Sequence, residues 1–276
     1  MASIARPLAA AFALAVTLGT TAEAADASAW VKDTNAEVRL IAGTGRADGD
    51  RLRAGVEIKM DSGWHTYWRY PGDSGVPPRF DFSGSSNLAN AKVLYPAPRL
   101  FSDETGHSIG YMDNVIFPLR VTPRDPGKPV MLRIKLDYAV CEKLCVPVEA
   151  HLELNVTGAS SKENAALAAA ESRVPAQVAA AELGLSARRV NDGPKPLVAV
   201  DLKSGPEKPV QVFVEGPSPE WALPIPKPVQ GAPAGRQHFG FELDGLPPGA
   251  DPKGPFELTF TVVQGDRAYE TRTKLQ

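Results

Sequence analysis

The residues best suited to chemistry in this chain are its cysteines. The sequence holds two, Cys141 and Cys145, separated only by Glu142, Lys143 and Leu144. Two thiols this close together can form a disulfide, bind a soft metal ion or exchange with the disulfide of another protein. The residues around the pair help to separate these three uses.

Two runs with alternating apolar residues flank the cysteines. Even-numbered positions are apolar from Leu132 to Val140 and again from Val146 to Val156. This pattern predicts two strands joined by a three-residue hairpin loop, with the even-numbered face towards the core. Directly opposed residues of such a hairpin have Cα separations of about 4.5–5.5 Å, which a disulfide accepts. Because both cysteines are odd-numbered, we expect both sulfurs on the side away from the core.

A purely structural disulfide is the main alternative to a reactive one. A bond that closes a loop of about five residues contributes roughly 2 kcal/mol through chain entropy. A chain of 276 residues can bury a large core without such a staple. Accessible short-loop disulfides are typically the labile or catalytic kind. We therefore favour redox exchange over a structural clip and over metal binding.

The N-terminal residues predict export. A short positive region at Arg6, an apolar run from Leu8 to Leu18 and the sequence Ala22-Glu23-Ala24 are typical of a signal peptide cleaved near Ala24. Later apolar runs are too short to span a membrane, so we expect a periplasmic protein without stable membrane insertion. Disulfides persist in that compartment. A net charge of -2 gives no electrostatic case for binding nucleic acid.

The pattern along the chain predicts a mostly β protein. The 24 glycines and 26 prolines favour strands joined by turns. After the signal peptide at 1–24, residues 25–157 read as a β-sandwich, because short strand-like runs alternate there with turn residues. Residues 158–184 are rich in alanine and predict a short helical connector, and residues 185–276 return to strands and predict a second small sandwich.

Four blocks of sequence, in order, resemble the N-terminal periplasmic domain of DsbD-type thiol:disulfide interchange proteins, and within these the ScsB (suppressor of copper sensitivity) branch. They are GWHTYWRYPGDSGVPP at 63–78, LYPAPRLF at 94–101, GYMDNVIFPL at 110–119 and DYAVCEKLCVPVEAHLEL at 137–154. The resemblance covers about residues 30–157. It implies an immunoglobulin-like sandwich with the cysteines at one end, capped by a loop. The expected fold is therefore two immunoglobulin-like β-sandwich domains joined by a helical connector.

The same resemblance implies a function. Family members receive electrons from a membrane-embedded partner through a thioredoxin-like domain and pass them to periplasmic proteins, including disulfide isomerases and proteins of cytochrome c biogenesis. By resemblance, Cys145 forms the mixed disulfide with a partner and Cys141 resolves it. The implied partners are thioredoxin-like periplasmic proteins or a membrane thiol reductase. No cofactor is expected, because sulfur performs the chemistry.

The sequence also departs from the family pattern. Complete members continue into a transmembrane region and a thioredoxin-like domain, whereas this sequence ends at Gln276. We therefore expect a protein-disulfide reductase component that acts with a separate electron donor, and whether the chain is itself an enzyme stays open.

Other residues are candidates for a supporting role. By their order in the chain, Asp103, Glu104 and His107 match the family's cap loop, where a carboxylate would raise a thiol pKa. A solvated polar loop explains them equally well. His65 and Tyr67 share one face of an aromatic-rich strand and are candidates for a partner surface, although packing is the favoured role for His65.

Two further alternatives remain. Cys141, Cys145, Met112 and His107 could supply soft ligands for Cu(I), which would suit a copper-binding protein with a role in copper tolerance. The chain has no M-x-x-M or H-x-H cluster, so metal binding is the minor hypothesis. The rival from another class is a non-catalytic β-sandwich binding module that carries the cysteines as a local clip.

Overall fold

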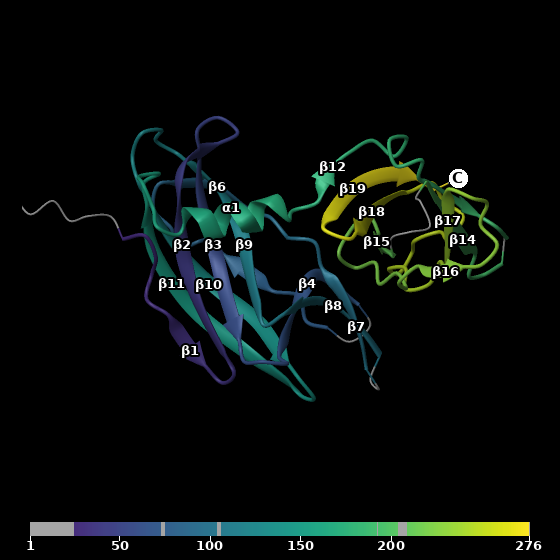
Figure 1. Ribbon diagram of the computed structural model, residues 1–276, viewed down its shortest axis with the longest axis horizontal. Coiled ribbons are helices and arrows are strands. Elements are labelled where there is room, and N and C mark those ends of the chain that lie inside the picture. Colours follow the sequence, from purple (N-terminus) through teal and green to yellow (C-terminus); the bar gives the residue numbers. More distant parts are fainter. Residues whose placement is uncertain (1–24, 73–74, 104–105, 192, 204–208, 276) are drawn as a thin grey trace, which may run out of the picture.

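The computed structural model describes residues 25–72, 75–103, 106–191, 193–203 and 209–275. The predicted signal peptide lies outside these residues. Two β-sandwich units lie side by side (Figure 1), so the predicted fold class, mostly β with immunoglobulin-like sandwiches, is confirmed. None of the helices in the described part of the chain is long and apolar enough to cross a membrane.

The first unit packs two sheets face to face. One sheet has the order β1 (Val31–Asp33), β2 (Ala36–Ala47), β3 (Arg51–Met60), β9 (Asn114–Pro123) and β6 (Leu88–Val93). The other has the order β11 (Cys145–Val156), β10 (Val130–Cys141), β4 (His65–Gly72), β8 (Gly106–Met112) and β7 (Arg99–Asp103), with β5 (Arg79–Asp81) also paired to β10. The pairings within both sheets are antiparallel.

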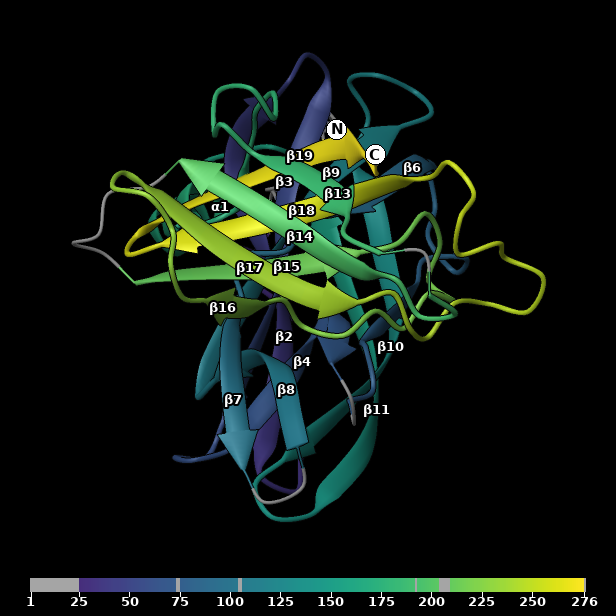
Figure 2. The same ribbon diagram turned by 90° about the vertical axis from the view of Figure 1, so that its right-hand side faces the viewer.

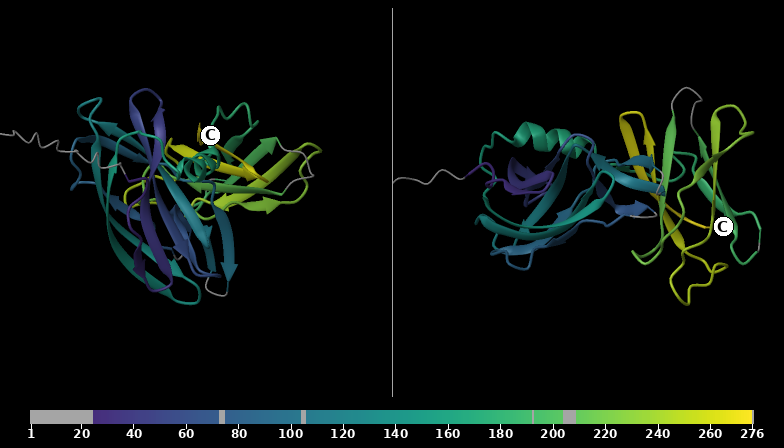
Figure 3. Two further views of the ribbon diagram at one scale, coloured as in Figure 1. Left: turned by 60° about the vertical axis from the view of Figure 1, so that its left-hand side comes forward. Right: turned by 90° about the horizontal axis from the view of Figure 1, so that it is seen from below.

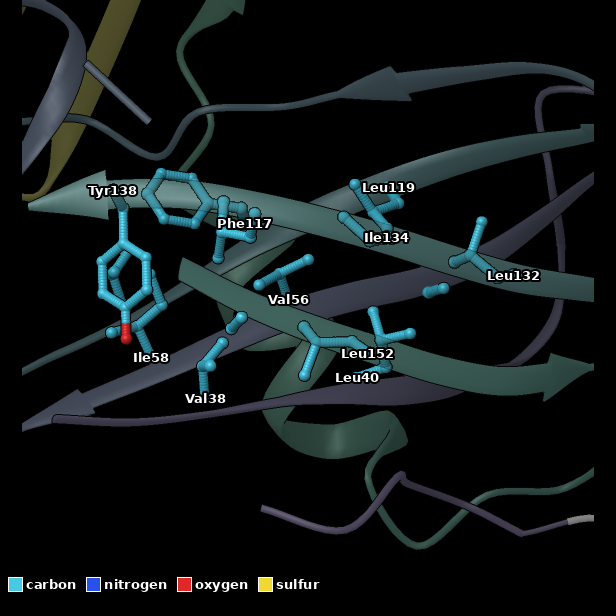
Figure 4. Close-up of a cluster of buried hydrophobic side chains, with 14 of the residues drawn as sticks. Val38, Leu40, Val56, Ile58, Phe117, Leu119, Leu132, Ile134, Tyr138 and Leu152 are labelled. Atoms are coloured by element: carbon cyan, nitrogen blue, oxygen red, sulfur yellow. The ribbon is translucent and has the colours of Figure 1, made fainter. Parts of the chain in front are cut away.

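The core of this unit follows from the alternation along β10 and β11. Leu132, Ile134 and Leu136 are buried, and their register partners on β11 are Leu154, Leu152 and Ala150, which are also buried. Apolar side chains from both sheets meet between the layers (Figure 4). The predicted inward-facing parity of these two strands is therefore confirmed.

The predicted connector is a helix attached to the first unit. Helix α1 (Asn164–Ser172) buries Leu167 and Ala170 against Ile41 of β2 and Ile116 of β9. Glycine is required beneath it, because a Cβ atom at Gly43 would lie 2.6 Å from a Leu167 methyl carbon. Only this part of the predicted 158–184 connector is α-helical, since the chain then enters β12 (Ala176–Gln177), which pairs with the second unit.

The second unit has its own two sheets and its own core. One sheet has the order β12, β19 (Arg267–Lys274), β18 (Glu257–Gln264) and β15 (Val210–Glu215). The other has the order β13 (Ser186–Arg189), β14 (Leu197–Lys203), β17 (Arg236–Glu242) and β16 (Lys227–Val229). Alternate residues of facing strands, among them Val198, Val200, Phe239 and Phe260, form a continuous buried cluster.

An ion cluster fixes α1 to the first sandwich. The Glu171 carboxylate accepts hydrogen bonds from Arg53 at 2.6 Å and from Arg120 at 2.6 Å. Burial alone would raise the pKa of Glu171, but the hydrogen bonds and charges of these arginines outweigh it and lower the pKa below its ordinary value. A depressed folded-state pKa stabilises the fold above the unfolded pKa, and that contribution is lost as the pH falls through the folded value.

We predict that Glu171→Gln lowers the free energy of unfolding at pH 7 by about 2 kcal/mol, as expected for the loss of charge-assisted hydrogen bonds. The loss should shrink as the pH falls towards the range where the wild-type carboxylate becomes protonated. Urea unfolding at several pH values measures it. Glu153→Gln, on an exposed strand face, is the matched control and should cost little. Equal effects of the two variants would contradict the prediction.

Candidate functional site

The two cysteines close the hairpin between β10 and β11. Cys141 is the last residue of β10 and Cys145 the first of β11, and the register pairs them directly. They form a disulfide, with a Cα–Cα separation of 4.2 Å. The hairpin tip lies at the lower end of the first sandwich in Figure 1. Seen from the side of the second unit, the tip projects beyond that unit (Figure 2).

The two sulfur-bearing residues differ in exposure. Cys145 is exposed, whereas Cys141 is only 2% exposed and forms a small buried cluster with Tyr67 and Ala139. Cys141 lies outside the main core, on the outer face that its odd number predicts, but it is covered there and not accessible. The reason is β4, which pairs with β10 at this end through His65 and Cys141 and places Tyr67 over the outer face.

The Tyr67 hydroxyl contacts both sulfurs. Its oxygen lies 2.9 Å from Sγ of Cys141 and 3.1 Å from Sγ of Cys145. A disulfide sulfur carries no proton, so the hydroxyl is the donor. The same hydroxyl is placed to donate to a thiolate formed at either sulfur when the bond opens. Tyr67, one of the predicted supporting residues, is therefore in direct contact with the disulfide.

Aromatic rings pack beside this contact. His65 is 7% exposed, and its ring meets Tyr67 edge-on at 5.5 Å between centroids. It also lies 5.4 Å from the ring of Phe101 on β7. Phe101 is not among the site residues predicted from the sequence. The signal available was its place in the LYPAPRLF block, immediately before the predicted cap segment.

The predicted cap segment belongs to the hairpin of β7 and β8. The backbone of Asp103 ends β7 and pairs with Gly106, so this segment is not a simple loop between distant strands. The side chain of Asp103 and all of Glu104 lie outside the described residues. His107 is half-buried on β8, in register with Ser102.

The residues proposed for Cu(I) are not assembled. Met112 pairs in register with His65, which is itself opposite Cys141. His107 lies five positions earlier on the same strand, about 16 Å from Met112 at the rise of a β-strand. Within the described ranges, no group of three or more histidine, cysteine, aspartate or glutamate residues is arranged to hold a metal ion.

Comparisons with known proteins agree with this geometry. Residues 36–157 match the family model for the N-terminal part of the thiol:disulfide interchange protein DsbD. This chain is similar in structure to the N-terminal periplasmic domain of ScsB from Proteus mirabilis. The TM-score is 0.70 at 19% sequence identity, over 91% of this chain and 98% of that one. No curated protein matches this chain in sequence.

The fold and the disulfide together define a class, a β-sandwich with a cysteine pair at the tip of one hairpin. In this chain, the first sandwich matches the family model of the DsbD N-terminal domain over residues 36–157, and the chain shares the fold of the ScsB domain. The resemblance drawn from the four sequence blocks is thereby confirmed.

We predict that Tyr67→Phe slows reduction of the disulfide by dithiothreitol about tenfold, because the departing thiolate loses a hydrogen bond. The rate is measured by quenching samples of the reaction, alkylating their free thiols and detecting the modified protein by mass spectrometry. Tyr138→Phe is the matched control. This tyrosine lies three residues before Cys141, and its buried hydroxyl has no hydrogen-bond partner among the described residues. A wild-type rate in Tyr67→Phe would show that the hydroxyl plays no part.

Proposed function

We propose that this protein is a thiol–disulfide exchange protein that passes electrons between protein partners through Cys141 and Cys145. The observation that carries the proposal is the disulfide of a DsbD/ScsB-type domain with one exposed residue, Cys145, and one buried residue, Cys141. An exchanging protein needs one sulfur that a partner can reach and a second sulfur that completes the reaction within the same chain.

Reduction proceeds by two in-line displacements. A thiolate of the partner attacks Sγ of Cys145, a mixed disulfide forms there, and the bond to Cys141 breaks. Cys141 departs as a thiolate that accepts a hydrogen bond from Tyr67. The partner's second thiolate then attacks its own sulfur in the mixed disulfide and releases Cys145. Two electrons pass from the partner's dithiol to this protein, and the partner leaves as a disulfide.

Delivery of electrons is the reverse reaction. In the reduced protein, the Cys145 thiolate attacks the disulfide of an acceptor and forms a mixed disulfide with it. Cys141, held beside it by the hairpin register, attacks Sγ of Cys145 and releases the reduced acceptor. The roles inferred from the family resemblance, Cys145 as the attacking residue and Cys141 as the resolving one, are supported by this difference in exposure.

The partners proposed are thioredoxin-like proteins. The hairpin tip that carries the disulfide projects beyond the second unit, which leaves room for a protein partner to approach it (Figure 2). Leu144, 79% exposed at the tip, adds an apolar contact next to Cys145. Because the similar ScsB domain is periplasmic, we place the exchange in the periplasm, with electrons supplied by a membrane thiol reductase. Roles in cytochrome c biogenesis or copper tolerance stay predictions from the family.

The second candidate is a binding module with a structural clip. The large apolar core of each sandwich is compatible with such a module. A structural role for the disulfide is hard to justify beside these cores, since a bond across one tight loop contributes only roughly 2 kcal/mol. A clip also gives no reason for a tyrosine hydroxyl in contact with both sulfurs.

We predict that a Cys141→Ser variant traps partners as mixed disulfides through Cys145, because the sulfur that would release them is gone. Incubation with oxidised thioredoxin-like proteins, then mass spectrometry of the non-reduced complexes, identifies the cross-linked cysteine. Cys145→Ser is the matched control: it keeps only the covered Cys141 and should trap far less. Equal trapping by both variants, or none by Cys141→Ser, would contradict the proposed exchange.

A further inference from the structure

The second sandwich contacts the first through consecutive residues of β4. The ring of Trp68 lies 5.8 Å from that of Phe213 on β15, measured between centroids, and both residues are buried in the core of the first sandwich. The Tyr70 hydroxyl donates a hydrogen bond to the carbonyl of Leu223. The view from below shows the two units meeting along this side (Figure 3).

Arg69, between Trp68 and Tyr70, makes ionic contacts across the interface. Its Nε and Nη2 donate to the two carboxylate oxygens of Glu215 at 2.8 and 2.7 Å, and Nη2 also reaches Glu270 on β19. The guanidinium carbon lies 4.5 Å from the centre of the Trp68 ring. A bidentate fork of this kind fixes direction as well as distance. Arg69 therefore fixes the position of β4 relative to β15 and β19 of the second unit.

The first sandwich packs Trp68 into its core, but its regular backbone pairing does not extend along this part of β4. β4 pairs with β8 from His65 to Tyr67 and then at Gly72, with an irregularity between, and with β10 only at His65 and Thr66. Among the described residues, none of the strands of the first sandwich pairs with 68–71. The contacts of the second sandwich take the place of the missing ladder.

Tyr67 lies at the boundary between these two kinds of support. The ladder to β8 is interrupted after this residue, and the contacts with the second sandwich begin at the next one. Its ring is closely covered, since a Cβ atom at Gly75 would lie 2.6 Å from its Cδ1. The hydroxyl of this ring reaches both sulfurs. The direction of the Tyr67 side chain thus depends on what holds the backbone on either side of it.

We propose that the second sandwich supports the redox site by holding β4 in place. In this proposal Arg69 is a positioning residue, which keeps the Tyr67 hydroxyl on the Cys141–Cys145 disulfide. The inference rests on the proposed exchange function and gives the second unit a task in it. Arg69 does not touch the sulfurs and acts only through Tyr67. This restriction makes the proposal testable, because two residues that act in series do not contribute independently.

The test is a double-mutant cycle on Arg69→Met and Tyr67→Phe in the full chain. The rate of disulfide reduction by dithiothreitol is measured for the wild type, both single variants and the double variant. We expect Arg69→Met to slow reduction by about threefold to tenfold. The upper value corresponds to complete loss of one hydrogen bond to the departing thiolate. The double variant should reduce at the rate of Tyr67→Phe alone. A wild-type rate in Arg69→Met, or two losses that multiply, would overturn the proposal.

Two further variants separate positioning from general damage. Arg53→Met breaks a comparable buried ion cluster in the same sandwich, at Glu171, and should leave the reduction rate unchanged while lowering thermal stability. Glu270→Gln keeps the Arg69–Glu215 fork, so it serves if Arg69→Met does not fold, and it should slow reduction by a smaller factor. Slow disulfide reduction in Arg53→Met would count against this supporting role. If Arg69→Met does not fold, a wild-type reduction rate in Glu270→Gln would also count against it.

The outcome is independent of the partner. Dithiothreitol needs no docking surface, so the cycle reports on Arg69 and Tyr67 even if the trapping experiment identifies no protein partner. Conversely, partners could be trapped while the rate losses of the two single variants multiply in the double variant. That result would support the exchange function and contradict the supporting role of the second sandwich.

Discussion

The ladder between β10 and β11 is the constraint on which the site depends. It runs without interruption from Val130 opposite Val156 to Cys141 opposite Cys145. A shift of one residue would turn the even-numbered apolar side chains out of the core and would also separate the two cysteines. The burial of Leu132, Ile134 and their partners therefore fixes the register at one end of the strands. The same register places the two cysteines opposite each other at the other end.

Strand β4 converts this symmetrical pair into an asymmetrical one. It borders β10 but not β11, so its Tyr67 covers Cys141 and leaves Cys145 open. In the exchange proposed above, this asymmetry sets the order of events, with the partner attacking Cys145 and Cys141 departing beside the Tyr67 hydroxyl. Since β4 also contacts the second sandwich, both units contribute to the position of Tyr67 beside the disulfide.

Sequence reasoning reached the parts of this arrangement that depend on local pattern. Strict alternation around the cysteines predicted the hairpin, its register and the inward face. It misjudged the exposure of Cys141, because which strand borders β10, and which residue then lies above the sulfur, is set by long-range pairing. The same limit hid Phe101 and the role of Arg69, whose partners lie more than 140 positions away in the chain. Local pattern also could not show that the predicted helix packs on the first sandwich, where Leu167 lies above Gly43.

The reduction potential of the Cys141–Cys145 couple tests the central claim most directly. It is obtained by equilibrating the protein in buffers of defined thiol–disulfide ratio and alkylating the free thiols. An exchanging disulfide should titrate in the range of known exchange proteins, roughly -120 to -270 mV. A potential below about -300 mV would mark a bond that resists reduction, as structural disulfides do, and would contradict the account.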